Sequence, residues 1–305
     1  MEERAQYSLP PPTCERHPWL MFSHGKNKQR QTFFNIPEHH YYTKIIPELH
    51  NKRVACSSYG WSILEDFDSD DCFLLNLVSM EKIQLPPMDL DYEVCILSLP
   101  PSDPNCYVLF VTNDFLLSWQ PGENEFVRKD FQIEVEFIDW ESIIVHQGQI
   151  YAIVNPKAYI LVADFTRSII RFTKLINESA PIIGSHGIIF FKSYLIESNG
   201  ELLVVHKVFS TMFQLRHVVL NFEIYRLDRS KDTWTKVRNI GKQTIFLSAD
   251  EGKCCLVQNA GIKENSIYFT RYRNLYVFDL DDQSVTVSLP CPNVSKSRSN
   301  LYWIW

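Results

Sequence analysis

The sequence predicts an all-β fold, a β-propeller of about six four-stranded blades, with seven as the alternative count. The main observation is a repeated hairpin, in which an apolar strand runs into Asn, Asp or a Pro-containing turn and a second strand returns. The spacing of the copies and a supply of short apolar runs support the same fold. The copies are CFLLNLVSMEKIQLP from Cys72, FLLSWQPGENEFVRKD from Phe115, YILVADFTRSIIRF from Tyr159, FEIYRLDRSKDTWTKV from Phe222, LYVFDLDDQSVTVSLP from Leu275, and a weaker TFFNIPEHHYYTKII from Thr32.

The turn residue of each copy gives an anchor for measuring the repeat. Successive anchors are 41, 43, 45, 64 and 51 residues apart. A blade of four short strands takes roughly 40–50 residues, so four intervals fit blades and the longest predicts an insertion. The anchors are Asn35, Asn76, Trp119, Asp164, Asp228 and Asp279.

Further strand-length segments precede most of the anchors. Each is apolar or alternating over about 4–8 residues, the length expected of strands rather than helices. We interpret them as inner strands of the blades. They are GWSIL at Gly60, CYVLFV at Cys106, QIYAIV at Gln149, ELLVVHKV at Glu201 and SIYFTR at Ser266.

Both ends of the sequence are apolar as well. PWLMF starts at Pro18 and LYWIW starts at Leu301. Closing a ring removes open strand edges, which otherwise invite aggregation. We therefore expect these two segments to complete one blade together.

The composition suits a β-rich chain. Hydrophobic residues make up 45% and aromatic residues 13%, with Val, Ile, Phe and Tyr concentrated in short runs. Glycine is scarce at 10 residues, so the turns must depend on Asn, Asp, Ser and the 16 prolines. No run approaches 18 consecutive apolar residues, and the sequence predicts no transmembrane helix.

Charge and cysteine content limit the partners and the compartment. The net charge is −6 and the basic residues are dispersed, so we expect no nucleic-acid partner. The eight cysteines are scattered through a chain large enough to build its own core. We expect reduced thiols, a cytoplasmic and/or nuclear location, no membrane association and a monomer.

The sequence contains no recognisable catalytic, cofactor or metal motif. His39 and His40 are adjacent, so on a strand they would point to opposite faces and would not share one metal ion. Cys254 and Cys255 have the same geometry. We therefore expect no catalytic residue, no cofactor and no metal site.

Other conspicuous side chains have structural interpretations. Asp281 and Asp282 lie in a predicted turn, where Asp caps its own backbone amides. Trp119, Trp140 and Trp234 recur in or near the hairpins, so we expect them to pack in the core or between blades.

Several segments, taken in order, resemble the signatures of the KIB-type plant β-propeller domain, a plant domain of unknown function commonly found C-terminal to an F-box. The resemblance covers residues 17–305. It implies a propeller, which in F-box members is the substrate-binding half of a ubiquitin-ligase adaptor. The segments are HPWLMF at His17, SSYGWSIL at Ser57, LLNLVSMEKIQLPP at Leu74, SYLIESNGELLVV at Ser193, FEIYRLDRSKDTWTKV at Phe222, NSIYFTR at Asn265 and YVFDLDDQSV at Tyr276.

We expect residues 17–305 to form this domain and residues 1–16 to be a flexible N-terminal segment without an F-box. An F-box needs several helices, and Pro10, Pro11 and Pro12 exclude a helix through their stretch. Two alternatives stay open, a stand-alone propeller and a fragment of a longer F-box protein. In either case the sequence given does not predict a contact with the ligase core.

The longest interval holds the candidate for partner binding. HKVFSTMFQLRHVVLN, from His206 to Asn221, mixes apolar and basic side chains. If it projects from the ring, such a loop can recognise an acidic or amphipathic partner; in the alternative, its apolar side chains lie back on the blade. The candidate residues are Phe209, Met212, Phe213, Leu215 and Arg216.

The sequence thus favours a non-enzymatic protein-interaction module. It resembles the substrate-recognition propeller of plant F-box proteins, here without an F-box, and its protein partner is unknown. The alternative is an enzyme that uses the central channel of the propeller. Acidic and His groups with shifted pKa values at the channel mouth would favour chemistry, and an apolar patch with a polar rim would favour protein binding.

Overall fold

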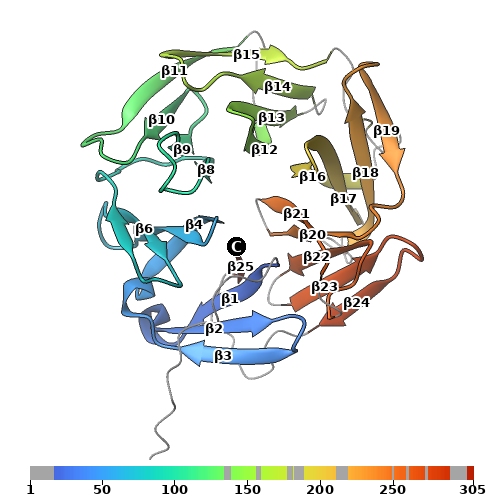
Figure 1. The fold of residues 1–305 in the computed structure, drawn as a ribbon, viewed down its shortest axis with the longest axis horizontal. Helices are drawn as coiled ribbons and strands as arrows, with labels where there is room; N and C mark the ends of the chain where they lie inside the picture. The colour runs from blue at the N-terminus through green and yellow to red at the C-terminus, as the bar shows by residue number, and fades with distance from the viewer. Residues whose placement is uncertain are drawn as a thin grey trace, which may run out of the picture.

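The computed structural model describes residues 17–133, 139–155, 159–176, 181, 189–210, 219–248, 251–258, 261–271, 274–288 and 301–305. In these residues the long elements are all strands, and their sheets stand around a central axis (Figure 1). The prediction of an all-β propeller is confirmed. Among the described residues, no helix has the length and apolar character needed to cross a membrane.

The described strands form five hydrogen-bonded sheets. The first contains β1 (Trp19–His24), β2 (Arg30–Asn35), β3 (His40–Lys44) and β25 (Leu301–Ile304). The second contains β4 (Lys52–Ser58), β5 (Trp61–Asp66), β6 (Cys72–Asn76) and β7 (Lys82–Gln84). The fourth contains β16 (Ile189–Ser198), β17 (Glu201–Ser210), β18 (Val219–Asp228) and β19 (Thr233–Val237). The fifth contains β20 (Gln243–Leu247), β21 (Gly252–Leu256), β22 (Ser266–Arg271), β23 (Asn274–Asp279) and β24 (Val285–Ser288).

The third sheet has eight strands, because two strands at the outside of the ring pair with each other. β11 and β15 run parallel, in register from Asp130 opposite Ile169 to Ile133 opposite Phe172. The prediction of a propeller is therefore confirmed as a ring of sheets but not as a count of six blades. The eight strands are β8 (Val94–Leu97), β9 (Val108–Val111), β10 (Phe115–Trp119), β11 (Val127–Ile133), β12 (Asp139–His146), β13 (Gln149–Asn155), β14 (Tyr159–Ala163) and β15 (Ile169–Lys174).

The predicted inner strands lie on the axis side of the repeated hairpins, as expected, with one further strand nearer the axis that was not predicted. GWSIL falls on β5, the second strand of its sheet, and β4 lies nearer the axis (Figure 1). The second position is also taken by CYVLFV on β9, QIYAIV on β13 and ELLVVHKV on β17, while SIYFTR on β22 is third in its sheet. Polar residues such as Ser57, Ser58 and Ser142 interrupt the innermost strands, which weakens their apolar signal in the sequence.

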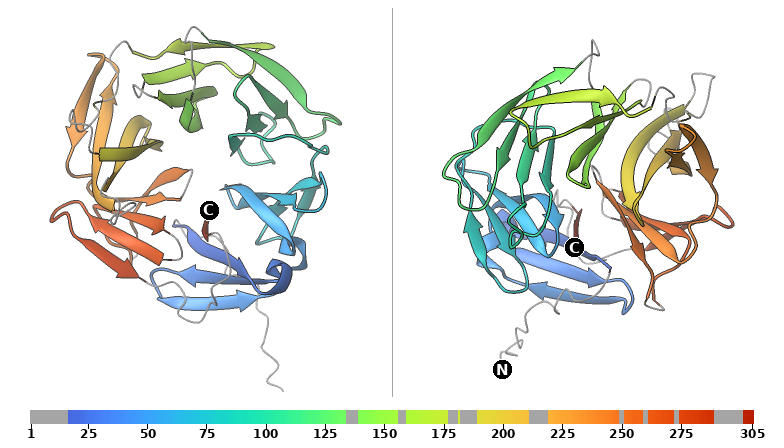
Figure 2. Two further views of the ribbon diagram at one scale, coloured as in Figure 1. Left: turned by 180° about the vertical axis from the view of Figure 1, so that it is seen from behind. Right: turned by 45° about the horizontal axis from the view of Figure 1, so that its top comes forward.

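The two terminal segments close the ring, as predicted. β1 pairs antiparallel with β25, from Trp19 opposite Ile304 to Phe22 opposite Leu301. The sheets nearest the two ends of the chain, blue and red, also lie side by side in both views of Figure 2. The last strand therefore forms the innermost strand of the first sheet.

The hydrophobic core lies between neighbouring sheets. In one cluster Trp61 and Cys72 of the second sheet pack with Phe110 and Trp119 of the third. Trp140 packs with Phe131 and Phe172 in another cluster. Trp234 lies against a cluster that joins β13 and β14 to β16 and β17. The structural interpretation of the tryptophans is confirmed.

The anchor residues of the repeat shape the turn that joins the two strands of each repeated hairpin. Side-chain oxygens of Asn76 and Asp164 accept backbone N–H groups two residues later, at 2.9 Å from Val78 and 3.0 Å from Thr166. Such local bonds replace the backbone pairing that ends with the strand. Asp228 and Asp279 make equivalent bonds, and Asn35 accepts the Glu38 N–H three residues later at 3.3 Å. Trp119 donates its indole N–H to the Glu123 carbonyl at 2.9 Å.

Removing Leu301–Trp305 should lower the yield of soluble monomer and the melting temperature. The deletion exposes the edge of β1 and removes the side chain of Trp303, which is 1% exposed. Size-exclusion chromatography and thermal unfolding would measure both effects. Leu301→Ala, at a half-buried position of the same strand, is the matched control. A truncated protein that stays monodisperse with an unchanged melting temperature would count against closure by β25.

Candidate functional site

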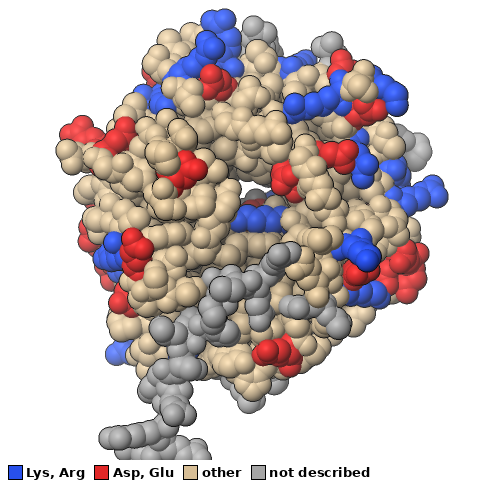
Figure 3. Space-filling view, viewed as in Figure 1, with Lys and Arg blue, Asp and Glu red and all other residues tan. Residues whose placement is uncertain are grey.

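A cavity of about 1250 Å³ opens at one mouth of the central channel. Every innermost strand of the ring borders it, either directly or at its end. Basic side-chain atoms are visible inside the central opening in Figure 3. Residues of these strands, or next to their ends, that line the cavity are Cys56, Ile96, Ile143, Glu197, Lys253 and Trp305.

Three tight turns at this mouth share a backbone conformation. Gly60, Gly148 and Gly200 have φ values of 79°, 73° and 81°, and each follows a residue that also has positive φ. Two-residue hairpin loops of this kind favour Asn before Gly. The preceding residues are Asn199 at 53°, Gln147 at 49° and Tyr59 at 56°.

Tyr59 is therefore the unusual member of the three. A bulky side chain at positive φ is strained, typically by about 1–2 kcal/mol. The Tyr59 hydroxyl donates to the Ser98 carbonyl at 3.1 Å, and the Gly60 N–H donates to the Trp305 carbonyl at 2.5 Å. The ring nevertheless stays 49% exposed at the cavity rim. Strained backbone positions cluster at functional sites, so this exposed aromatic residue is a candidate for partner binding.

Lys253 is the one Lys or Arg among the described residues that line this cavity. Its ammonium donates to the Ser57 carbonyl at 3.0 Å and to the Ser58 hydroxyl at 2.8 Å, and lies 5.0 Å from the ring centroid of Trp305. Burial within the channel lowers the pKa of Lys253 from its ordinary value. Lys253 thus ties β21 to β4 and to the end of the chain.

The cysteine thiols at the cavity are not activated. Burial raises the pKa of Cys254 to about 11 and that of Cys255 to about 12, and it raises the pKa of Cys95 well above its usual range. Since the thiolate is the nucleophile, these groups are unreactive at neutral pH. The six cysteines that the structure describes are all free. Over the same residues, no three His, Cys, Asp or Glu side chains are grouped as metal ligands.

The opposite end of the channel has a smaller cavity of about 480 Å³. It is bordered by the first residues of β4, β8 and β25 and by Arg271 at the end of β22. Arg53 donates to Glu65 at 2.7 Å and to the Tyr92 hydroxyl at 2.9 Å, and Tyr92 donates to Glu65 at 2.5 Å. This mouth is therefore more polar than the one rimmed by Tyr59.

Of the five predicted partner-binding residues, the structure describes Phe209. It lies near the end of β17, is half-buried and packs against the core cluster that contains Ile224 and Phe269. The Phe209 side chain thus lies back on the sheet, as the alternative expects of the apolar residues, and the role of the loop in partner binding stays a prediction. Met212, Phe213, Leu215 and Arg216 lie outside the described residues. Long strands account for part of the 64-residue interval between the anchors Asp164 and Asp228, since β16, β17 and β18 have 10 residues each.

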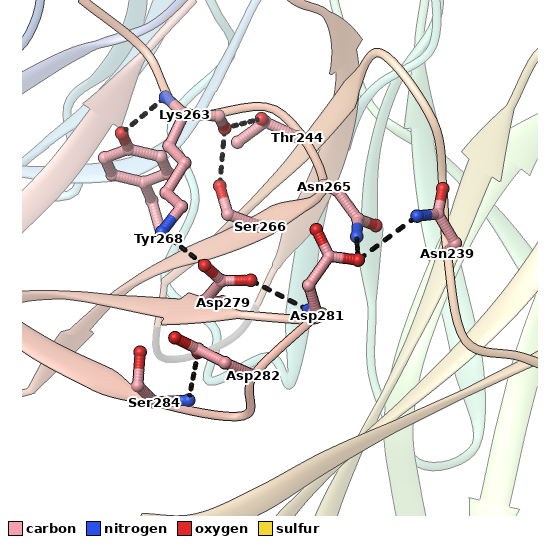
Figure 4. A network of polar contacts seen from close by, with 10 residues as sticks. All are labelled: Asn239, Thr244, Lys263, Asn265, Ser266, Tyr268, Asp279, Asp281, Asp282 and Ser284. Carbon is pink, nitrogen blue, oxygen red and sulfur yellow. Dashed lines mark hydrogen bonds and ion pairs between the residues drawn. The ribbon is translucent and has the colours of Figure 1, made fainter.

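Asp282 has the predicted turn role, whereas the carboxylate of Asp281 accepts side-chain amides of Asn265 and Asn239 instead of its own backbone N–H groups. In the network of Figure 4, Asp279 accepts the Asp281 N–H at 2.8 Å and forms an ion pair with Lys263. Asp281 accepts the Asn265 side-chain amide at 2.7 Å, and Asp282 accepts the Ser284 N–H at 2.8 Å. These carboxylates hold the loops around β23 together.

A family model described as the KIB1-4 β-propeller matches residues 33–292. The chain belongs to this family. The match confirms the KIB-type resemblance, and it includes all six turn anchors from Asn35 to Asp279 and the rim residue Tyr59.

The KIB1-4 β-propeller chain is also similar to F-box proteins of Arabidopsis thaliana. An F-box/kelch-repeat protein is 22% identical over 84% of this chain and 71% of the relative. An F-box protein is 23% identical over 85% of this chain and 66% of the relative, and a putative F-box protein is 26% identical over 94% and 81%. Matches to two other relatives span about half of their length, 47% and 50%.

Tyr59 and Lys253 were not predicted from the sequence. In SSYGWSIL, Gly60 and Trp61 draw attention, but Trp61 is 8% exposed and packs in the core. The usable signal for Tyr59 is a Tyr-Gly pair between two strands, where Asn-Gly is usual. Lys253 has no such signal, because its neighbours in space come from β4 and from Trp305.

His206 should make the stability of the protein depend on pH. It is 1% exposed, with Nδ1 2.9 Å from the Ser193 hydroxyl, and burial lowers its pKa to about 4. As the pH falls from about 6.5 to about 4, the unfolded chain binds a proton that the folded chain does not, so this group lowers the free energy of unfolding by about 3 kcal/mol.

Urea denaturation across this pH range would measure the effect. His206→Gln should lose that part of the pH dependence, and His40→Gln, at an exposed position, should keep it. An equal slope in wild type and His206→Gln would refute the assignment.

Proposed function

We propose that this chain is a non-enzymatic protein-interaction module that captures a protein partner at the channel mouth rimmed by Tyr59. The observation that supports this most directly is the strained turn that holds Tyr59 in solvent beside a large cavity. Leu256, next to the cavity residue Cys255, is also 49% exposed, and Tyr59 and Trp305 border a cavity whose lining is mainly apolar. Aromatic anchors at a pocket edge are typical of binding hot spots.

Binding is favoured over catalysis by the state of the groups inside the cavity. The thiols are held protonated, and the Lys253 ammonium is engaged by two oxygens and an indole ring. The mouth thus combines a mainly apolar lining with an ammonium group that already has partners.

We infer six blades. The described residues form six core clusters, and each cluster joins two neighbouring units of the ring. These units have four strands each, except the unit of β20–β24, which has five. One cluster joins β9 and β10 to β12–β15, inside the eight-stranded sheet. That sheet is then two blades connected by the β11–β15 pairing.

The relatives suggest the setting in which the module works. Their names identify them as F-box proteins, which supports a role for this propeller as the partner-recognising part of a ubiquitin-ligase adaptor. An F-box is helical, and the described residues contain no α-helix. Contact with the ligase core would therefore require a segment other than the described propeller.

The remaining expectations from the sequence stay part of the proposal. Free thiols support a cytoplasmic and/or nuclear protein. The net charge of −6 supports a protein partner rather than a nucleic acid, and we propose a monomer that does not associate with membranes.

Tyr59→Asn should weaken partner capture at least tenfold with little effect on stability. Asn tolerates positive φ, so relief of strain offsets the lost hydrogen bond to Ser98 to within about 1 kcal/mol. Quantitative affinity capture from plant extract, with thermal unfolding in parallel, would measure both. Ile169→Ala is the matched control, because Ile169 is 50% exposed on the outer strand β15. Equal capture by the two variants would overturn the assignment of this mouth.

Deleting Ser210–Leu215 tests the loop predicted from the sequence. If the loop projects from the ring and contacts the partner, capture should weaken while the melting temperature stays nearly unchanged. A collapse of the melting temperature would show that these residues belong to the core.

A further inference from the structure

Glu197 is an exposed carboxylate at the channel mouth that Tyr59 borders. It lies near the end of β16, where one of its oxygens accepts the Gly200 N–H at 2.5 Å. This bond ties the side chain to its own turn, so little rotamer freedom remains to be lost when a ligand binds. Among the described residues, Glu197 has no ion-pair partner, and its second carboxylate oxygen accepts no hydrogen bond.

The other charges that line this cavity have partners. Over the part of the chain that the structure describes, the lining contains Glu197, Glu251 and Lys253 and no further Asp, Glu, Lys or Arg. Burial lowers the pKa of Lys253 and the charge of Glu251 opposes this shift, so the ammonium and that carboxylate attract each other. The ammonium also donates to two oxygens of β4. Glu197 therefore leaves the mouth with an uncompensated negative charge.

A site at the other mouth shows what a Tyr ring and a Glu carboxylate hold together. The guanidinium of Arg53 lies 5.3 Å from the ring centroid of Tyr92, and Arg53 donates to Glu65 at 2.7 Å. The Tyr92 hydroxyl also donates to Glu65, at 2.5 Å. The ring face and the carboxylate thus attract the same cation.

The outer strands β18 and β19 contain a second site of this kind. The ammonium of Lys236 lies 5.9 Å from the ring centroid of Tyr225 and 2.9 Å from the carboxylate of Glu223. The Tyr225 hydroxyl donates to Glu223 at 2.5 Å. The chain thus uses Tyr and Glu to hold a basic side chain of either type, Arg at the first site and Lys at the second.

Tyr59 and Glu197 supply the same two groups without a cation between them. β4 and β16, which lead to their turns, lie on different sides of the central axis (Figure 1). Partial burial raises the pKa of Tyr59, and the charge of Glu197 adds to this shift, so the two side chains interact across the mouth. The Tyr59 hydroxyl donates to Ser98 rather than to Glu197, and no Lys or Arg of the described residues lies over its ring.

We propose that the partner inserts a Lys or Arg side chain between the Tyr59 ring and the Glu197 carboxylate. Such insertion rests on the proposed function, since the same mouth must capture the partner. The cavity of about 1250 Å³ beside both residues accommodates the long stem of the side chain, and its mainly apolar lining suits the methylene groups. An acidic side chain does not fit, because Glu197 repels it.

Peptide pools of random sequence around one fixed central residue test this chemistry without a known partner. Four pools carry Lys, Arg, norleucine or Glu at the centre, and the retention of each pool on the immobilised full chain is measured. We expect the Lys or the Arg pool to be retained at least threefold more than the norleucine pool, whose central side chain is apolar and of similar length. This preference should shrink as the ionic strength rises.

Glu197→Gln should reduce the preference for a basic centre to less than half. Gln keeps an oxygen that accepts the Gly200 N–H, so the turn and the melting temperature should stay unchanged. Glu125→Gln is the matched control, because it removes an equal charge from an exposed position between β10 and β11 and should keep the preference.

Equal retention of the Lys, Arg and norleucine pools would overturn the proposal, as would an undiminished preference in Glu197→Gln. Stronger retention of the Glu pool would also overturn it and would indicate an acidic partner. The proposed function has a separate test in the capture by Tyr59→Asn. If Tyr59→Asn weakens capture while the pools show no basic preference, the mouth binds a partner of other chemistry.

Discussion

The structure depends on closure of the ring by its first and last strands. Each sheet has apolar residues on both faces, and each face is covered by the next sheet. In such a ring, the first and last sheets would each keep an uncovered apolar face if they did not pack against each other. The pairing of β1 with β25, together with the packing of Trp303 against Phe246, completes that contact. It also places Trp305 at the channel mouth, where its carbonyl accepts the Gly60 N–H.

Closure explains why the candidate sites lie at the axis. With the apolar faces used between sheets, the innermost strands are left to border a channel, and they carry the serines and cysteines that line it. Polar atoms there must find partners from other sheets, as Lys253 does with Ser57 and Ser58. An aromatic side chain that is left exposed at the channel mouth, such as Tyr59, is then a candidate for partner binding.

Much of the fold could be predicted from the sequence, because its signals are local. An Asn or Asp that ends an apolar strand caps the following turn through its own side chain, as Asn76 and Asp228 do. Such a residue after an apolar run therefore predicts a hairpin from the sequence alone. The terminal pairing was predictable because both segments are apolar. The innermost strands were not, since the channel permits polar residues that break the pattern.

The candidate sites could be predicted only in part, because they depend on backbone conformation and on contacts between distant segments. The strain at Tyr59 becomes visible because the structure gives this bulky residue the same positive φ as Asn199 and Gln147 in the equivalent turns. Of the predicted loop residues, the structure describes Phe209, which lies against the core.

The pairing of β11 with β15 has a mechanical consequence. Backbone hydrogen bonds tie two neighbouring units together at the circumference, in addition to the side chains packed between them. That arc of the ring should therefore resist deformation more than junctions held by side chains alone. At the junction that holds Trp305 and Tyr59, a backbone bond from the Gly60 N–H to the Trp305 carbonyl stands in place of a paired couple of strands among those described.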